Sequence, residues 1–171
     1  MKNITNRRDF VKAGSTLSAG AFLASPYIAQ AAQDDKVIKI GLVGIGGRGS
    51  GAAAQAMNAD PNVALTAIGD LFEDRIKLRS RILKARGRDK YQVTEETTFI
   101  GFDSYKKVID SGVDVVILTT PPAFRPQHLE YAISKGVHCF FFFLFAVDAE
   151  GVREVIDLAK KTGCCGCGRR T

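Results

Sequence analysis

Three glycines in the first third of the chain are spaced as a phosphate-binding turn requires. Gly44, Gly46 and Gly49 follow an apolar run at 37–43 and precede an alanine-rich segment, an order that predicts a strand, a tight turn and a helix. Gly44 permits the turn, Gly46 removes a Cβ that would block a pyrophosphate, and Gly49 lets the helix approach the sheet. The helix, starting near Gly47, would direct unpaired N–H groups at the phosphates. The spacing therefore predicts a dinucleotide site.

An acidic residue stands where such a site needs one. A second apolar run at 63–68 leads to Asp70, which lies 26 residues after Gly44. A carboxylate at the end of the second strand can accept hydrogen bonds from the adenosine ribose and repels a 2′-phosphate, so we expect NAD rather than NADP. Alone, G-x-G-x-x-G is a weak signal in a chain with 17 glycines, and a glycine-rich loop that binds nothing is the alternative. Arg48 could contact phosphate or be a solvated side chain at the helix start.

A pair of prolines ends another expected strand. The run at 113–118 is almost continuously apolar, as in a central parallel strand, and Thr119, Thr120, Pro121 and Pro122 follow it. Proline cannot donate to a sheet ladder, so the pair stops the strand and fixes the loop that leaves its carboxyl end. Ligands bind at this edge in open α/β sheets, which makes the loop a second candidate part of the site.

The segments that must position these residues alternate between strands and helices. Apolar runs predict strands at 37–43, 63–68, 98–100, 113–118 and 138–143. Helical spacing predicts the intervening helices, with these inward-facing residues: Phe72, Ile76, Leu83, Tyr105, Val108, Ile109, Leu129, Ala132, Ile133, Val152, Val155, Ile156 and Ala159. Gly87 and Gly136 are expected to end two helices, and Asp103 and Asp148 to cap two others. The alternation predicts a right-handed, doubly wound parallel sheet of the α/β class.

The amino terminus has the pattern of a targeting segment. Arg7 and Arg8 precede Phe10 and a mildly apolar stretch, and small residues up to Ala31 form a cleavage site. Residues 1–31 thus resemble a twin-arginine export signal, which predicts export to the periplasm, already folded, by the twin-arginine machinery. The apolar part is too short to be a stable membrane span. A basic amphipathic first helix is the alternative.

The remaining composition describes one ordinary domain. Of the formal net charge of +6, the export signal carries half. The other charged residues are scattered rather than clustered, so no nucleic-acid partner is expected. The length left after cleavage suits a single domain, expected at 36–163, followed by an irregular tail of Cys, Gly and Arg at 164–171.

The cysteines and histidines predict no metal site. Cys164 and Cys167 form a lone C-x-x-C pair, whereas a structural zinc ion needs four ligands. His138 falls in an expected strand and is predicted to be packed or hydrogen-bonded rather than catalytic. His128 lies at the start of a helix beside the Thr-Thr-Pro-Pro loop. The apolar run 140–145 is too short to span a bilayer and predicts burial in the sheet or aggregation.

Together these motifs resemble the amino-terminal domain of the Gfo/Idh/MocA oxidoreductases. The resemblance covers about 37–161 and rests on the glycine turn, the acidic run at 70–75, the Thr-Thr-Pro-Pro loop, His128 and the step at 136–138. It implies NAD(P) bound across the sheet, with that loop and His128 lining the cofactor groove, and a sugar or polyol as the substrate. With an export signal in front, the chain is most similar to the secreted bacterial members.

The resemblance also implies features that this sequence replaces or omits. The family has a Glu-Lys-Pro motif after the fifth strand, whose lysine serves the chemistry, and here Phe142, Phe143 and Leu144 stand in its place. Phenylalanine cannot transfer a proton, so no catalytic residue is assigned and the chain is expected to be inactive alone. The family's second, substrate-binding domain would begin about where the chain ends at Thr171, so a truncated or misread longer gene is expected.

Three functions therefore remain open. The first is the NAD(P)-binding domain of an exported Gfo/Idh/MocA-like oxidoreductase. The second is part of one of the family's NAD-dependent glycoside hydrolases, which oxidise a sugar transiently. The third is a noncatalytic binding or assembly subunit. A substrate-binding domain would distinguish the first two.

Overall fold

The computed structural model describes residues 36–142, 144 and 146–162. The expected export signal at 1–31, Phe143 and the expected tail at 164–171 lie outside these residues. The described residues belong to one compact unit, Lys36–Thr171. Among the helices that the structure describes, none combines the length and apolar character needed to cross a membrane.

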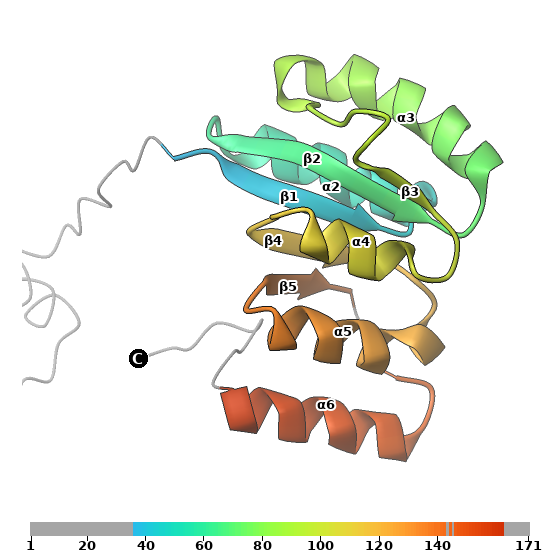
Figure 1. Cartoon of the computed structure of the whole chain (residues 1–171), viewed down its shortest axis with the longest axis vertical. Helices are drawn as coiled ribbons and strands as arrows, with labels where there is room; N and C mark the ends of the chain where they lie inside the picture. Colours follow the sequence, from blue (N-terminus) through green and yellow to red (C-terminus); the bar gives the residue numbers. More distant parts are fainter. Residues whose placement is uncertain (1–35, 143, 145, 163–171) are drawn as a thin grey trace, which may run out of the picture. The chain divides into compact units, whose positions relative to one another are not determined.

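Five parallel strands form one sheet in the order β3-β2-β1-β4-β5 (Figure 1). They are β1 (Ile38–Val43), β2 (Val63–Asp70), β3 (Thr98–Ile100), β4 (Val115–Leu118) and β5 (His138–Phe141). In the middle strand, Val43 pairs with Gly69 of β2 on one side and with Leu118 of β4 on the other. The chain thus builds the sheet outward in both directions from β1. The parallel, doubly wound α/β fold predicted from the sequence is confirmed.

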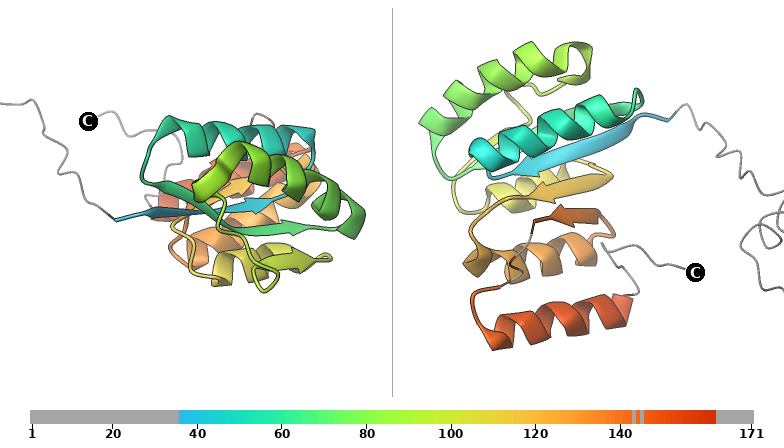
Figure 2. Two further views of the ribbon diagram at one scale, coloured as in Figure 1. Left: turned by 90° about the horizontal axis from the view of Figure 1, so that it is seen from above. Right: turned by 180° about the vertical axis from the view of Figure 1, so that it is seen from behind.

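Helices cover both faces of this sheet, as Figure 2 shows. One face carries α2 (Gly47–Ala59) and α3 (Glu73–Gly87), and the other carries α4 (Ser104–Asp110), α5 (Arg125–Ser134) and α6 (Ala149–Thr162). Two short 3-10 turns, η1 (Arg88–Lys90) and η2 (Pro122–Phe124), follow α3 and precede α5. Each face therefore has a hydrophobic core of its own.

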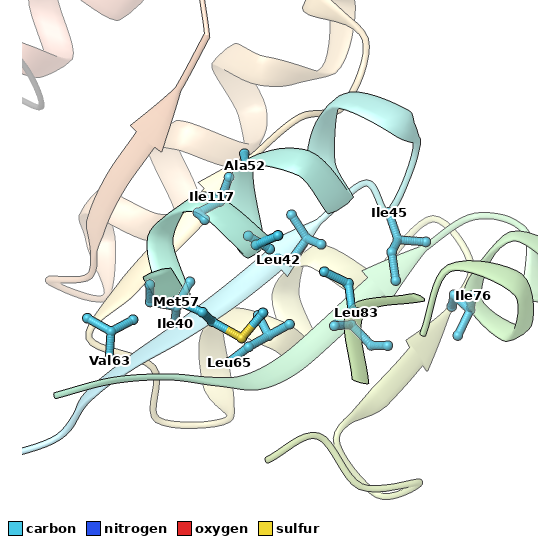
Figure 3. Packing of buried hydrophobic residues seen from close by; sticks show 13 residues of the cluster. Ile40, Leu42, Ile45, Ala52, Met57, Val63, Leu65, Ile76, Leu83 and Ile117 are labelled. Atoms are coloured by element: carbon cyan, nitrogen blue, oxygen red, sulfur yellow. The ribbon is translucent and has the colours of Figure 1, made fainter. Parts of the chain in front are cut away.

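The core under α2 and α3 contains Ile76 and Leu83, two of the three inward-facing residues that the periodicity of the sequence predicts for α3 (Figure 3). Leu42, Leu65 and Leu83 are fully buried, and Met57 of α2 lies beside Leu65 of β2. Burial of one such side chain contributes about 2 kcal/mol to the free energy of folding. The core therefore holds β1, β2 and the two helices in a fixed arrangement around the end of β1, where the glycine turn begins.

Phe72 and Ile156 were expected to face inward and His138 to be packed or hydrogen-bonded, and all three are exposed. Phe72 precedes α3 in an extended conformation, so it does not share the inward face of the helix, and 48% of it is exposed. Ile156 is 46% exposed because α6 packs at the border of its layer, where Val155 reaches the core. His138 is exposed as the first residue of β5, the outer strand of the described sheet.

Two of the expected helix ends are confirmed. Gly136 follows α5 with a φ of 71°, in the left-handed region that favours glycine. Asp148 precedes α6, and its Oδ1 accepts a hydrogen bond of 2.8 Å from the N–H of Gly151. Such a cap satisfies one of the N–H groups that a helix start leaves unpaired.

The other two helix ends also lie at the expected residues, but their local geometry differs from that of the first two. Gly87 is the last residue of α3 with a φ of −82°, and the left-handed residue is Arg88, with a φ of 47°. Asp103 does precede α4, but no side-chain cap forms there, and its carboxylate pairs with Lys106 at 2.9 Å. A nearby ammonium thus takes the carboxylate that would otherwise bind the helix N–H groups.

Candidate functional site

A groove of about 490 Å³ opens at the carboxyl ends of β1, β2 and β4. This is the edge where the direction of winding reverses, and open α/β sheets bind their ligands there. Of the residues singled out in the sequence, the groove is lined by Gly44, Gly46, Asp70, Thr119, Thr120, Pro121 and His128. Gly47, Arg48 and Gly49 form the first turn of α2, and Pro122 starts the 3-10 turn η2.

The glycine turn is held together by close backbone approaches. Gly44 has a φ of 91°, and its carbonyl accepts a hydrogen bond of 2.6 Å from the Thr119 hydroxyl, which also lies 3.0 Å from the carbonyl of Val43. A Cβ at Gly49 would lie only 2.0 Å from the carbonyl oxygen of Gly44. The third glycine is therefore required because α2 starts against the turn itself. Thr119 fixes this turn from the end of β4.

The space in front of α2 is open. Gly46 is the N-cap residue of α2, and a Cβ built on it would meet no protein atom within 4 Å. The first N–H groups of a helix have no partner within the helix and carry the positive end of its dipole. A glycine that faces open space at this point leaves room for a pyrophosphate to reach those groups. The residues present therefore fit a dinucleotide.

Asp70 is buried, with 7% of its surface exposed, and it ties the end of β2 to the glycine turn. Its Oδ2 accepts a hydrogen bond of 2.7 Å from the N–H of Ile45, and its Oδ1 accepts one of 3.1 Å from the N–H of Phe72. A carboxylate can accept about four hydrogen bonds, so these two leave capacity for ribose hydroxyls. The sequence predicted the place of Asp70 but gave no sign of its two backbone bonds.

His128 lies at the opposite side of the groove, packed among aromatic rings. Its ring stacks on Tyr105 with centroids 4.0 Å apart, and its Nδ1 is 3.2 Å from the hydroxyl of Thr120. Burial lowers the pKa of His128 to about 4, so the imidazole is neutral at neutral pH. His128 therefore offers a neutral hydrogen-bonding ring that orients Thr120, and supplies no positive charge for a phosphate.

Arg48 was expected either to contact phosphate or to be solvated, and the structure shows a different partner for it. Its guanidinium carbon lies 3.9 Å from the centroid of the Phe142 ring, a cation–π arrangement. The two residues are far apart in sequence, and they meet because the side chain of Arg48, in the first turn of α2, reaches the residue that follows β5. Arg48 thus links the glycine turn to the loop that follows β5.

Arg125 is a residue of the groove that the sequence analysis missed. Its Nε donates to the carbonyl of Thr120 at 2.9 Å, and its Nη1 donates to the carbonyls of Phe142 and Leu144 at 2.7 and 2.6 Å. It follows the proline pair closely, which was the available signal, but these carbonyl partners come from two different loops. Only the folded chain brings them together.

A protein-family model matches most of the chain. A family model described as "Oxidoreductase family, NAD-binding Rossmann fold", GFO_IDH_MocA, matches residues 38–168. The chain belongs to the Gfo/Idh/MocA family. Its cofactor is accordingly NAD, in agreement with the expectation from the glycine turn.

Curated relatives of this Gfo/Idh/MocA domain are named as glycoside hydrolases. A glycosyl hydrolase family 109 protein of Porphyromonas gingivalis is 26% identical over 129 residues, which is 74% of this chain and 26% of the relative. An alpha-N-acetylgalactosaminidase of Shewanella oneidensis is 25% identical over 182 aligned positions, which is 95% of this chain and 38% of the relative. The chain thus spans well under half the length of these relatives.

Solved structures with the same fold include inositol dehydrogenases. The myo-inositol 2-dehydrogenase of Lactobacillus plantarum matches with a TM-score of 0.60 at 22% identity, over 74% of this chain and 34% of that one. A scyllo-inositol dehydrogenase of Lactobacillus casei, solved with NAD(H) and scyllo-inositol, matches with a TM-score of 0.61 at 21% identity, over 75% and 34%. At this level of identity the likeness shows a shared fold.

The loop after β5 differs in shape from one that contains the family motif. Leu144, which stands by register in the place of the motif's proline, has a φ of 76°. The proline ring restricts φ to about −65°, so a proline could not adopt this backbone. Phe143, in the place of the lysine, lies outside the described residues. Within the described residues, no group of His, Cys, Asp and Glu side chains could hold a metal ion.

Proposed function

We propose that this chain binds NAD across the carboxyl edge of its sheet, as the nucleotide domain of an oxidoreductase that acts on a sugar or polyol. The observation that carries the proposal is the open space at Gly46 in front of α2, with the buried Asp70 beside it. The names of the inositol dehydrogenases that share the fold support a polyol substrate.

Each part of the groove has a distinct task in this proposal. The N–H groups at the start of α2 bind the pyrophosphate, and the carboxylate of Asp70 accepts hydrogen bonds from the adenosine ribose. Thr120 and His128 line the half of the groove that takes the nicotinamide. When bound, NAD supplies an acceptor for hydride. The chain's own residues orient it and exclude water from one side.

Calorimetry of the 171-residue chain with NAD tests this proposal. Gly46→Ala should leave the melting temperature unchanged, because the new methyl meets no protein atom, and should weaken NAD binding at least about tenfold, a loss of about 1.4 kcal/mol. Gly51→Ala is the matched control, since Gly51 lies in α2 and a Cβ there also meets nothing. If Gly46→Ala binds NAD as tightly as the control Gly51→Ala does, the proposed site is refuted.

We also propose that the chain as given binds the cofactor without turning over a substrate. Hydride transfer from the carbon that bears a hydroxyl group needs a base to take the hydroxyl proton, and Phe143 stands where the family has its lysine. The left-handed Leu144 in place of the proline supports a loop of altered shape. A panel of sugars and polyols mixed with NAD should give no reduced cofactor by absorbance. Turnover that disappears in Gly46→Ala would contradict this expectation.

Part of an NAD-dependent glycoside hydrolase is the second candidate, because the curated relatives carry that name. Both candidates use the same groove, so NAD binding does not separate them. An aryl α-N-acetylgalactosaminide does, since a hydrolase releases the phenol in a reaction that needs NAD but does not consume it. This release should be measured on the longer protein, if the genomic DNA encodes one.

We propose further that residues 1–31 direct export through the twin-arginine machinery. The paired Arg7 and Arg8 support this, and the alignment to the Shewanella relative leaves out only about nine residues of this chain, so it includes most of the segment. A reporter fused after Gln33 should reach the periplasm, and replacement of both arginines by lysine should stop it. Continued export of the double variant would contradict the proposal.

A further inference from the structure

Arg125 joins two loops that leave neighbouring strands at the same edge of the sheet. Its Nε donates to the carbonyl of Thr120, two residues after β4. Its Nη1 donates to the carbonyls of Phe142 and Leu144, in the segment after β5. The guanidinium is planar and presents its donors in a rigid fork, so the three acceptors fix its orientation and it fixes theirs.

Of these two loops, the one after β4 lines one particular half of the groove, and Arg125 joins it to the one after β5. Asp70 places the adenosine half on the β2 side of the glycine turn, and the strand order puts β4 and β5 on the other side of β1. A dinucleotide whose pyrophosphate lies at the turn must therefore extend its nicotinamide half toward the ends of β4 and β5. Arg125 lines the groove on that side.

The same contacts explain how Thr120 is held in place. Its backbone carbonyl is bound by Arg125, and its hydroxyl is 3.2 Å from the Nδ1 of His128. His128 is in turn stacked on Tyr105, in the buried layer between α4 and α5. Thr120 is thus anchored from two directions, whereas the carbonyls of Phe142 and Leu144 are bound by the guanidinium alone among the side-chain contacts described.

We propose that Arg125 is a positioning residue for the nicotinamide half of the site, where it holds the loop after β5 against the loop after β4. The inference rests on the proposed NAD site. Without the guanidinium, the carbonyls of Phe142 and Leu144 lose charge-assisted hydrogen bonds and the two loops move independently. The loop after β4, which lines the nicotinamide half of the groove, is then no longer held against the loop after β5, while the glycine turn and Asp70 stay as they are.

Comparison of NAD with ADP-ribose, which lacks the nicotinamide ring, tests this assignment. Arg125→Met keeps the apolar length of the side chain and removes every donor. By calorimetry on the 171-residue chain, NAD affinity should fall about tenfold toward that of ADP-ribose, and ADP-ribose affinity should change less than about twofold. Arg153→Met, at an exposed position of α6, is the control and should change neither affinity.

The other outcomes overturn the inference in distinguishable ways. An equal loss of NAD and ADP-ribose affinity would mean that Arg125 only supports the fold, and unchanged NAD affinity would mean that it does not shape the site. Failure of the unmodified chain to bind either ligand would refute the proposed function, and the inference with it.

A second variant covers the case in which Arg125→Met does not fold. Arg125→Lys keeps the positive charge, but a single ammonium cannot reach both loops in one plane. It should give a smaller loss of NAD affinity and faster amide exchange in a peptide that covers 138–147. Unchanged exchange there together with unchanged NAD affinity would refute the positioning role.

Discussion

At the scale of single residues, Asp70 has two tasks that one substitution can separate. Asp70→Asn keeps an amide oxygen that can accept from the N–H of Ile45 and removes the charge that would face a 2′-phosphate. A like-charge contact of this kind costs on the order of 1 to 4 kcal/mol. Calorimetry should therefore show that NAD binds more tightly than NADP to the unmodified chain, and that the gap shrinks at least about tenfold in the variant.

Asp89→Asn is the control for Asp70→Asn, because Asp89 is exposed in η1 and away from the groove. It should leave the preference for NAD intact. Equal affinities for the two cofactors in the unmodified chain would show that the carboxylate of Asp70 does not face the 2′ position.

The pKa of His128 makes stability depend on pH in a defined window. Because burial lowers the pKa from 6.5 in the unfolded chain to about 4 in the folded one, the unfolded state binds an extra proton between these values. The free energy of unfolding is therefore highest above pH 6.5 and should fall as the pH drops toward 4, by up to roughly 3 kcal/mol. His128→Gln does not titrate and should flatten urea-derived stability across this window.

The exposed histidine provides the matched control for this measurement. His138→Gln replaces a histidine that is exposed at the start of β5, and it should keep the slope of the unmodified chain between pH 6.5 and 4. If the stability of His128→Gln falls between pH 6.5 and 4 as steeply as that of the unmodified chain, the fall does not come from the buried His128.

At the scale of elements, α2 is held at both ends by side chains from elsewhere. Its start rests against the glycine turn, and at its other end the Nζ of Lys90 donates to the carbonyls of Met57 and Asp60 at 2.5 and 2.8 Å. A cation at a helix carboxyl terminus also complements the helix dipole. Lys90→Met should therefore lower the free energy of unfolding by about 1 kcal/mol, as urea denaturation would show.

Lys84→Met, at an exposed position near the end of α3, serves as the comparison for Lys90→Met. It should change stability by less than about 0.5 kcal/mol. A similar loss in both variants would indicate a general effect of surface charge and not a cap on α2.

The sequence could predict elements whose signal is local. Apolar runs located all five strands, and the glycine spacing located the turn that precedes α2. It could not predict contacts between distant segments, such as Arg48 on Phe142 or Arg125 between two loops, because no periodicity encodes which loops meet. Phe72 was wrongly predicted to lie on the inward face of α3, because helical spacing alone does not show that α3 begins at Glu73, one residue after Phe72.

At the scale of the whole molecule, the outer strand of the described sheet is a weak point. Phe140 of β5 is 48% exposed and meets Phe142 edge to face, with centroids 5.3 Å apart. An apolar outer strand can pair with other chains. Phe140→Lys should therefore reduce aggregation, measured by light scattering at matched concentration, and should leave the melting temperature nearly unchanged.

Phe102→Lys is the control for Phe140→Lys, since Phe102 is 72% exposed but lies at the rim of the groove, outside any strand. It should have a smaller effect on scattering. Equal improvement in both variants would attribute aggregation to exposed aromatic surface in general and not to the outer strand.

The central place of β1 has a consequence during protein synthesis. Its two neighbours are made at different times, because β4 ends at Leu118, 48 residues after the end of β2 at Asp70. A ribosome that adds about 5–20 residues per second needs several seconds for this interval, during which one edge of β1 has no partner. Its free N–H and C=O groups can meanwhile pair with any other extended chain. Translation speed between these two strands therefore sets how long the nascent chain is open to misassembly.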